Sequence, residues 1–429
     1  MFEYSQDTSW AVDRVRFEYL GRRYHGRGLL KWSIEQGFHL DAFLDSHGTA
    51  LPNRIQFGKV RVPAPSELRS VRMRLEGFGH AITPQLTPGD QLELIGHSRL
   101  DVDFPSLLFS RPFSQPTRSE KYYGAGLFEL GEGLVLPDRL ERVLRLSGQQ
   151  IQFGVSAGGI KYEDESLKLR AWLESQTQLR MEWTLSGNAW CRTDAWKFAE
   201  GAEAALSFLG GRTVRLLERS TRRGSKEYIE RRKRLQPVYL GILSLPPRAT
   251  WKPQRIDKGE FVALTRFFTS GGKDTLVAQR MCVQMAEVCR QDTLAAKELL
   301  CANILDAGLR TLAGKPYKRS DPSTKIEANM AMFCAKYFSN DVWKGCCEGV
   351  VATYHDLRHR NAHPDWLTTE GGGLSDNQLE RSLDGMIRLS WFYGYMILAM
   401  AGFKSLEPKF PCPHKDWDPL ITITREHTA

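Results

Sequence analysis

The sequence predicts an α+β protein of several domains, in which a β-rich N-terminal half precedes an all-α helical bundle. Through the first 245 residues, short segments alternate polar with β-branched or aromatic residues. From about residue 257 onward, apolar residues recur at intervals of three and four. Leu245-Pro246-Pro247 marks the change in pattern. We therefore place a β-rich region at 1–245, a helical domain at 255–410 and a C-terminal tail at 411–429.

The β-rich region is expected to form one or two subdomains. Segments 15–19, 91–95 and 179–186 have the composition of strands. One helix interrupts this pattern near 194–209, where the apolar spacing is helical and Gly210-Gly211 supplies a common C-terminal stop. The region thus combines many short strands with a single helix.

The second half is expected to contain several helices joined by short loops, which is typical of a bundle. They are placed near 258–270, 274–290, 292–313, 323–338, 341–362 and 376–403. The most apolar stretch, 389–403, has 15 residues, whereas a membrane span needs about 20. We expect a buried helix there and no membrane partner.

The net charge, the spacing of the cysteines and the N-terminal residues indicate which ligands, metal sites and cellular compartment to expect. The net charge of +9 is compatible with binding to a polyanion without requiring it. The eight cysteines include no Cys-x-x-Cys pair, which argues against a disulfide framework and a four-cysteine zinc site and favours thiols in the core. Because the N-terminus lacks the pattern of a secretory signal, a cytoplasmic protein is expected.

The segment 354–364 (YHDLRHRNAHP) is the most informative for chemistry. It closes a predicted helix, and Pro364 disfavours helical geometry at His363, so that this imidazole can turn into a cleft. Histidine exchanges protons near neutral pH, and arginine carries a permanent charge on a planar fork that matches phosphate oxygens. RNA supplies its own nucleophile, the 2′-OH. Arg358 and His363 are therefore candidates for phosphodiester cleavage.

The run from Arg358 to His363 matches the Arg-x4-His signature of the HEPN superfamily, in which a polar residue commonly follows the arginine; here that residue is His359. The helical region, about 255–410, resembles a HEPN domain because the motif ends a helix and a long apolar helix follows. The architecture of the whole chain also resembles the ApeA-type HEPN proteins of bacterial anti-phage defence.

The resemblance implies a metal-independent endoribonuclease without a cofactor, whose substrate is RNA, with tRNA as one candidate. Arg358 would bind the scissile phosphate, His363 would move the proton, and His359 would orient the substrate. Three further residues would support them: His355, Arg360 and Asn361. HEPN nucleases build their active site across a dimer, so a homodimer or higher homo-oligomer is expected.

The same resemblance assigns the β-rich region a sensor or regulatory role, with a phage-derived molecule as trigger. Two alternatives to catalysis stay open. The first is an inactive HEPN module that binds RNA or protein. The second is a metal site, because His355, His359 and His363 recur every four residues. Position 360 is arginine, so the His-Glu-x-x-His pattern is absent, and two neighbouring arginines would repel a cation.

A second basic segment, 212–234, holds ten Lys or Arg against three Glu. It is expected to form a β-hairpin that turns at Arg223-Gly224-Ser225. One interpretation is a solvated basic face. The other is contact with the RNA backbone, since each charge placed near a phosphate adds salt-dependent affinity. The candidate RNA-binding residues are Arg222, Arg223, Arg231, Arg232 and Lys233.

Overall fold

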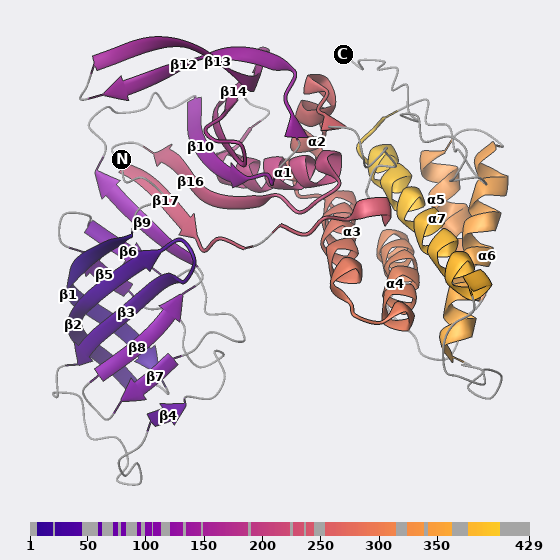
Figure 1. Cartoon of the computed structure of the whole chain (residues 1–429), viewed down its shortest axis with the longest axis horizontal. Coiled ribbons are helices and arrows are strands. Elements are labelled where there is room, and N and C mark those ends of the chain that lie inside the picture. Colours follow the sequence, from indigo (N-terminus) through magenta and orange to yellow (C-terminus); the bar gives the residue numbers. More distant parts are fainter. Residues whose placement is uncertain are drawn as a thin grey trace. The chain divides into compact units, whose positions relative to one another are not determined.

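The structure of the chain, a computed structural model (Figure 1), forms two compact units. It describes residues 7–19, 22–44, 59–61, 72–75, 79–82, 92–95, 99–104, 106–112, 121–131, 134–146, 149–187, 190–223, 226–235, 237–243, 254–314, 324–338, 342–362 and 376–403. The β-rich unit comprises Met1–Glu129, Leu140–Ala199 and Arg215–Gln236. The helical unit comprises Leu130–Arg139, Glu200–Val214 and Pro237–Ala429.

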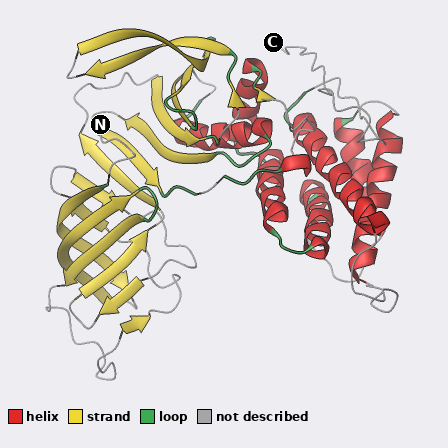
Figure 2. Cartoon of the chain, viewed as in Figure 1, coloured by secondary structure: helices red, strands yellow, loops and turns green. Residues whose placement is uncertain are grey.

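The predicted fold class is confirmed: a β-rich half precedes an all-helical region, as the colours of Figure 2 show. The strands of the N-terminal half are β1 (Thr8–Tyr19), β2 (Arg22–Ser33), β3 (Gly37–Leu44), β4 (Lys59–Arg61), β5 (Arg72–Leu75), β6 (Gly79–Ile82), β7 (Leu92–Ile95), β8 (Arg99–Phe104), β9 (Ser106–Pro112), β10 (Lys121–Glu129), β11 (Leu134–Val135), β12 (Asp138–Leu146), β13 (Gln149–Glu163), β14 (Leu167–Leu173), β15 (Gln178–Ser186), β16 (Arg215–Arg223) and β17 (Lys226–Arg232). A last short strand, β18 (Gln254–Arg255), pairs in parallel with β11.

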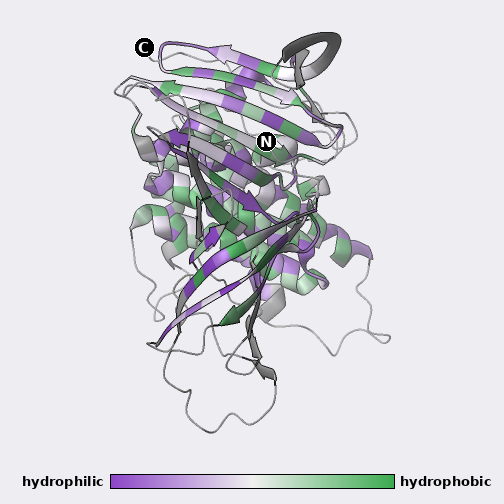
Figure 3. Ribbon diagram, turned by 90° about the vertical axis from the view of Figure 1, so that its left-hand side faces the viewer, coloured by the Kyte–Doolittle hydropathy of each residue, from purple (hydrophilic) through white to green (hydrophobic). Residues whose placement is uncertain are grey.

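Two antiparallel sets of strands make up the sheet of the β-rich unit. The hydrogen-bonded order is β12-β13-β14-β15-β10-β16-β17-β9-β6-β5-β1-β2-β3-β8-β7-β4, and the two sets join where β17 pairs with β9. Hydrophilic and hydrophobic residues alternate along the strands in Figure 3, and along β14 buried residues alternate with exposed ones, as a strand with a single buried face requires. In the set that contains β1, β2, β3 and β9, the side chains of Trp10, Trp32 and Phe109 surround the buried ring of Phe38.

The helices lie close to their predicted positions. They are α1 (Arg192–Gly210), α2 (Lys258–Ser270), α3 (Lys273–Arg290), α4 (Leu294–Ala313), α5 (Thr324–Tyr337), α6 (Val342–Ala362) and α7 (Asp376–Met400), and a short 3-10 helix, η2, spans Gly241–Leu243. Three helices are followed by a glycine with positive φ: Gly211, within the predicted stop of α1, Gly271 after α2 and Gly314 after α4. Glycine adopts this backbone conformation without the steric cost that a Cβ brings, so it ends a helix readily.

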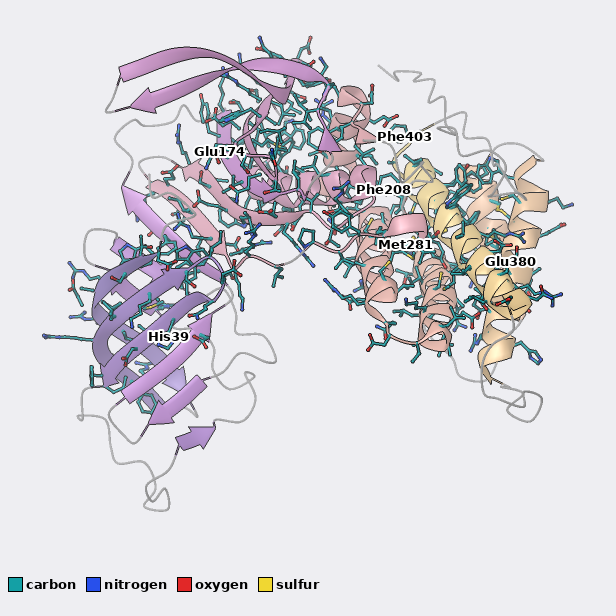
Figure 4. All side chains as sticks on the ribbon, viewed as in Figure 1. His39, Glu174, Phe208, Met281, Glu380 and Phe403 are labelled. Atoms are coloured by element: carbon teal, nitrogen blue, oxygen red, sulfur yellow. A yellow bond between two sulfur atoms is a disulfide. The ribbon has the colours of Figure 1, made fainter. Side chains whose placement is uncertain are left out.

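The helical unit is held together by packing between α3, α4, α5, α6 and α7. Met281 of α3, labelled in Figure 4, reaches Gly308 of α4, where a Cβ would stand 2.4 Å from its methyl carbon. Residues 385–400 of α7 are almost entirely buried, which confirms that 389–400 belongs to a buried helix. Over the residues that the structure describes, no helix combines the length and the apolar character needed to cross a membrane.

Candidate functional site

Helix α6 carries the Arg-x4-His motif on its last turns. The helix ends at Ala362, as the sequence predicted from Pro364. Arg358 and His359 lie on this helix, with Arg358 half-buried and His359 exposed. Arg360 and Asn361 belong to the helix by their backbone, but their side chains lie outside the described part of the chain. His363 also lies outside the described residues.

Arg358 is held from within its own helix. Nη1 of Arg358 donates a hydrogen bond to the hydroxyl of Tyr354, one turn earlier, and its guanidinium carbon lies 5.8 Å from the centre of the Tyr354 ring. Tyr354 is only 1% exposed, so it is a fixed support. Among the described residues no carboxylate pairs with Arg358. The guanidinium is thus oriented by a neutral group and keeps its full charge for an anion.

Both members of an ion pair on α4 affect the pKa of Tyr354 through their charges. Arg310 Nε donates to Asp306 Oδ1 at 2.6 Å. Burial raises the pKa of Tyr354, and the Asp306 carboxylate raises it further, while the hydrogen bond from Arg358 acts in the opposite direction. The tyrosine hydroxyl therefore stays neutral near physiological pH, which suits its role as acceptor from Arg358.

His355, three residues before Arg358 on the same helix, pairs with α5. Its Nε2 donates to Oε1 of Glu327 at 2.8 Å, and the two side chains are 42% and 49% exposed. Both residues line a cavity of about 680 Å³ between α5 and α6, together with apolar side chains such as Met330, Val351 and Ala352. Thus His355, which was predicted as a supporting residue, is held by Glu327 at the wall of this cavity.

Helix α7 fixes α6 at the level of the motif. A Cβ at Gly385 would stand 3.0 Å from Cδ2 of Leu357, so a larger residue there would require the Leu357 side chain to shift. Nearby, Arg388 of α7 donates to the hydroxyl of Thr353 at 3.3 Å. Leu357 is fully buried. The residue directly before Arg358 is therefore locked in the core.

The cysteines differ from the expectation of free core thiols. Cys334 of α5 and Cys347 of α6 form a disulfide, so the prediction is wrong for this pair; the packing of the two helices brings the two thiols together across the cavity wall. Cys191 is exposed. Cys301 fits the expectation, because it is buried and burial raises its pKa to about 12. Cys412 lies outside the described residues.

The basic segment forms the predicted antiparallel pair of strands, in which Arg223 at the end of β16 lies opposite Lys226 at the start of β17. Its arginines are largely paired. Arg219 Nε lies 2.6 Å from Glu230 Oε2, with both side chains under 10% exposed. Arg231 donates to Glu218 at 2.8 Å and is likewise buried. The hairpin therefore holds internal ion pairs in place of a fully solvated basic face.

The other candidate RNA-binding residues differ in how exposed their side chains are and in whether a glutamate pairs with them. Arg222 is 44% exposed and lies 3.7 Å from Glu227, whereas Arg232 donates to Glu230 at 3.1 Å. Lys233 is half-buried. The side chain of Arg223 lies outside the described part of the chain. Of the four predicted residues whose side chains the structure describes, Arg231 is buried and the other three are at least partly exposed.

Sequence reasoning missed the residues that position the motif. Tyr354, Asp306 and Glu327 carry no motif, and their roles depend on helix packing. The ion pairs of the hairpin, in contrast, could be inferred from the sequence. A two-residue turn after Arg223 sets Glu218 opposite Arg231, which is the register observed, so these ion pairs followed from the predicted turn.

Comparisons with known proteins identified no relative of this chain. No family model matches the chain, and neither a curated protein nor a solved structure matches it. Within the described residues, no group of three or more His, Cys, Asp or Glu is placed to hold a metal ion. The motif and the geometry of α6 are therefore the features that indicate a function.

Proposed function

We propose that the helical region is a metal-independent endoribonuclease of HEPN type. The observation that carries this proposal is the state of Arg358: its guanidinium is held by the buried Tyr354 and has no carboxylate partner among the described residues. Such a group is pre-oriented for an anion, and a phosphodiester in the transition state is the anion that the Arg-x4-His pattern suggests. The proposal also draws on the resemblance to HEPN domains.

In this mechanism the 2′-oxygen of one nucleotide attacks the adjacent phosphorus. The bond from phosphorus to the 2′-oxygen forms while the bond to the 5′-oxygen of the next nucleotide breaks. His363 accepts the proton of the 2′-OH, and Arg358 stabilises the charge that develops on the phosphate oxygens. His359, Arg360 and Asn361 support substrate binding. The departing 5′-oxygen takes up a second proton, so the products are a 2′,3′-cyclic phosphate and a 5′-hydroxyl.

The biological setting is proposed from the resemblance to anti-phage proteins. The enzyme would cleave RNA, with tRNA as a candidate, in the bacterial cytoplasm and cause abortive infection as a toxin. The β-rich unit would recognise a phage-derived trigger. A homodimer or higher homo-oligomer would bring two copies of α6 together, most simply about a two-fold axis. Light scattering tests the assembly, and a fully active monomer would contradict it.

The central test is incubation of the purified full-length protein with total RNA and tRNA in the presence of EDTA. We expect cleavage that leaves a 2′,3′-cyclic phosphate or the 3′-phosphate derived from it. His363→Ala should lose at least about 10²-fold in rate. Loss of activity on chelation, restored by zinc, would favour the metal site. Binding of RNA without cleavage by wild type would favour the inactive module.

A further inference from the structure

Beside the motif lies an oriented histidine–carboxylate pair. His355 and Glu327 come from different helices, α6 and α5, and their side chains meet at 2.8 Å. The carboxylate accepts from Nε2–H, which fixes the orientation of the ring and leaves Nδ1 as the nitrogen that does not contact Glu327. At 42% exposure, the imidazole is accessible to a substrate. Histidine is the side chain that most often transfers protons in enzymes, and a partner that fixes its ring can orient it for that role.

The pair is also close to Arg358 in the helix. His355 and Arg358 are three residues apart, so their Cβ atoms lie roughly 5–6 Å from each other on one side of α6. The cavity that His355 and Glu327 line extends from this point between α5 and α6. Other charged groups at its wall are Lys344 and Glu348. Asp356 and His359 follow on the same helix.

Cleavage of RNA by attack of the 2′-OH requires two proton transfers. One group removes the proton of the 2′-OH, and a second supplies a proton to the departing 5′-oxygen. Arg358 cannot serve as either, because it does not deprotonate in proteins. His363 fills one role in the proposed ribonuclease. The second role needs another group that titrates near neutral pH.

We propose that His355, positioned by Glu327, is this second proton-transfer group and acts as the general acid. The inference rests on the proposed ribonuclease function. Protonated His355 gives its proton to the 5′-oxygen as the bond from phosphorus to that oxygen breaks. His363 has by then taken the proton of the 2′-OH, so that the two histidines exchange protonation states and solvent resets both. No further reactant is consumed. Glu327 is a positioning residue, because it acts through the imidazole.

A purely structural role makes a different prediction. A half-exposed ion pair contributes little to stability, so its removal should leave both folding and cleavage nearly unchanged. The β-rich unit offers a matched control of this kind. His39, labelled in Figure 4, lies 2.9 Å from Asp103 between β3 and β8, and both side chains are partly exposed.

The test uses the full-length protein and a short RNA that spans the bond which wild type cleaves fastest. A second RNA carries sulfur in place of the 5′-bridging oxygen at that bond. A thiolate leaves without prior protonation, since thiols are far stronger acids than alcohols. Wild type, His355→Ala, Glu327→Gln, Arg358→Ala, His363→Ala and His39→Ala are compared on both RNAs. His355→Gln replaces His355→Ala if the latter does not melt like wild type by circular dichroism.

We expect His355→Ala to be about 10²-fold slower on the oxygen RNA and close to wild type on the sulfur RNA. Glu327→Gln should show a smaller defect with the same rescue. Arg358→Ala and His363→Ala should be slow on both, and His39→Ala normal on both. Equal rates of His355→Ala and wild type on the oxygen RNA, or equal defects on both RNAs, would overturn the assignment to His355 alone. No cleavage by wild type, or normal cleavage by Arg358→Ala, would overturn the ribonuclease itself.

Discussion

Two arginine-rich segments of the chain use their charge in opposite ways. In the hairpin β16–β17, Arg219 and Arg231 are buried and each faces a glutamate on the neighbouring strand. At the end of α6, Arg358 is held by the hydroxyl and ring of Tyr354. The hairpin has many more basic residues, yet much of its charge is neutralised internally. The number of arginines in a segment therefore does not measure the charge that a ligand meets.

The largest contrast is expected between two single substitutions. Arg358→Ala should lower the rate of RNA cleavage by at least about 10²-fold without lowering thermal stability much, since its side chain is only half-buried. Arg231→Ala should do the reverse, lowering stability while the folded fraction cleaves normally. Rates per folded molecule and melting curves measure both. Arg280→Ala, an exposed arginine on α3, serves as control. Equal effects on rate would remove the distinction between the two segments.

The next prediction concerns the ion pairs of the hairpin. Glu230→Ala leaves the buried Arg219 without its carboxylate and should cost about 3–5 kcal/mol of unfolding free energy. Glu163→Ala breaks an exposed pair with Lys168 and should cost less than about 1 kcal/mol. Urea titrations of both variants give the comparison. Similar small costs would mean that the hairpin charges are solvated after all.

Tyr354→Phe tests how much the hydrogen bond between Arg358 and the Tyr354 hydroxyl contributes to the rate of cleavage. The substitution removes the hydroxyl that accepts from the guanidinium and retains the buried ring. We expect cleavage to slow by about tenfold, which corresponds to about 1.4 kcal/mol of transition-state stabilisation. The melting temperature should change little. A rate equal to that of wild type would show that the ring alone positions Arg358.

The helical unit should lose stability at alkaline pH. In the helical unit, burial raises the pKa of Tyr354 and Tyr393, and it raises that of Cys301 to about 12. These groups ionise more readily when unfolded, from about pH 9 for thiols and pH 10 for tyrosines. Their contribution to stability is therefore complete below about pH 9 and is lost as pH rises through the folded-state values. Urea unfolding under reducing conditions, followed by the helical circular dichroism signal at pH 8 and pH 10.5, should show a lower midpoint at the higher pH. An unchanged midpoint would contradict this.

The smallest effect is expected from two charges of the basic segment 212–234 that keep at least part of their side chains exposed. If Arg222 and Lys233 contact the RNA backbone, replacing both with Ser should reduce the log–log salt dependence of binding by about 0.7 for each phosphate that is no longer neutralised. Turnover of bound RNA should not change, because the motif on α6 is intact. If the hairpin serves solubility or contacts a protein trigger, filter binding across salt concentrations should give the same slope for both proteins.

Much of the fold could be predicted because apolar periodicity and helix stops are local signals. The helix predicted at 258–270 spans Lys258–Ser270, and the one predicted at 341–362 spans Val342–Ala362. In both, a cap or a break sits within a residue or two of the end, and Asp257 caps α2 by accepting from the amide of Glu260. Such ends depend on neighbours in the sequence and little on the rest of the fold.

The candidate site was predictable only in part. Arg358 and its helix follow from the motif, but Tyr354 has the composition of an ordinary core residue. Its role arises because burial on the core side brings its hydroxyl under the guanidinium one turn later. Glu327 was out of reach for a different reason, since its contact with His355 spans 28 residues and depends on how α5 packs against α6. The partners of the motif residues are therefore set by tertiary packing, which the motif itself does not encode.

The strand order has a consequence for synthesis on the ribosome. Strands β9 and β10 follow one another in the chain, but β16 and β17 separate them in the sheet. Until residue 232 has been made, β9 and β10 each lack the neighbour that β17 and β16 provide. Open strand edges pair readily with other chains, and long-range pairing forms slowly. The nascent chain thus passes through a period in which more than half of it exists with an unfinished sheet, and a chaperone that shields strand edges would act in that period.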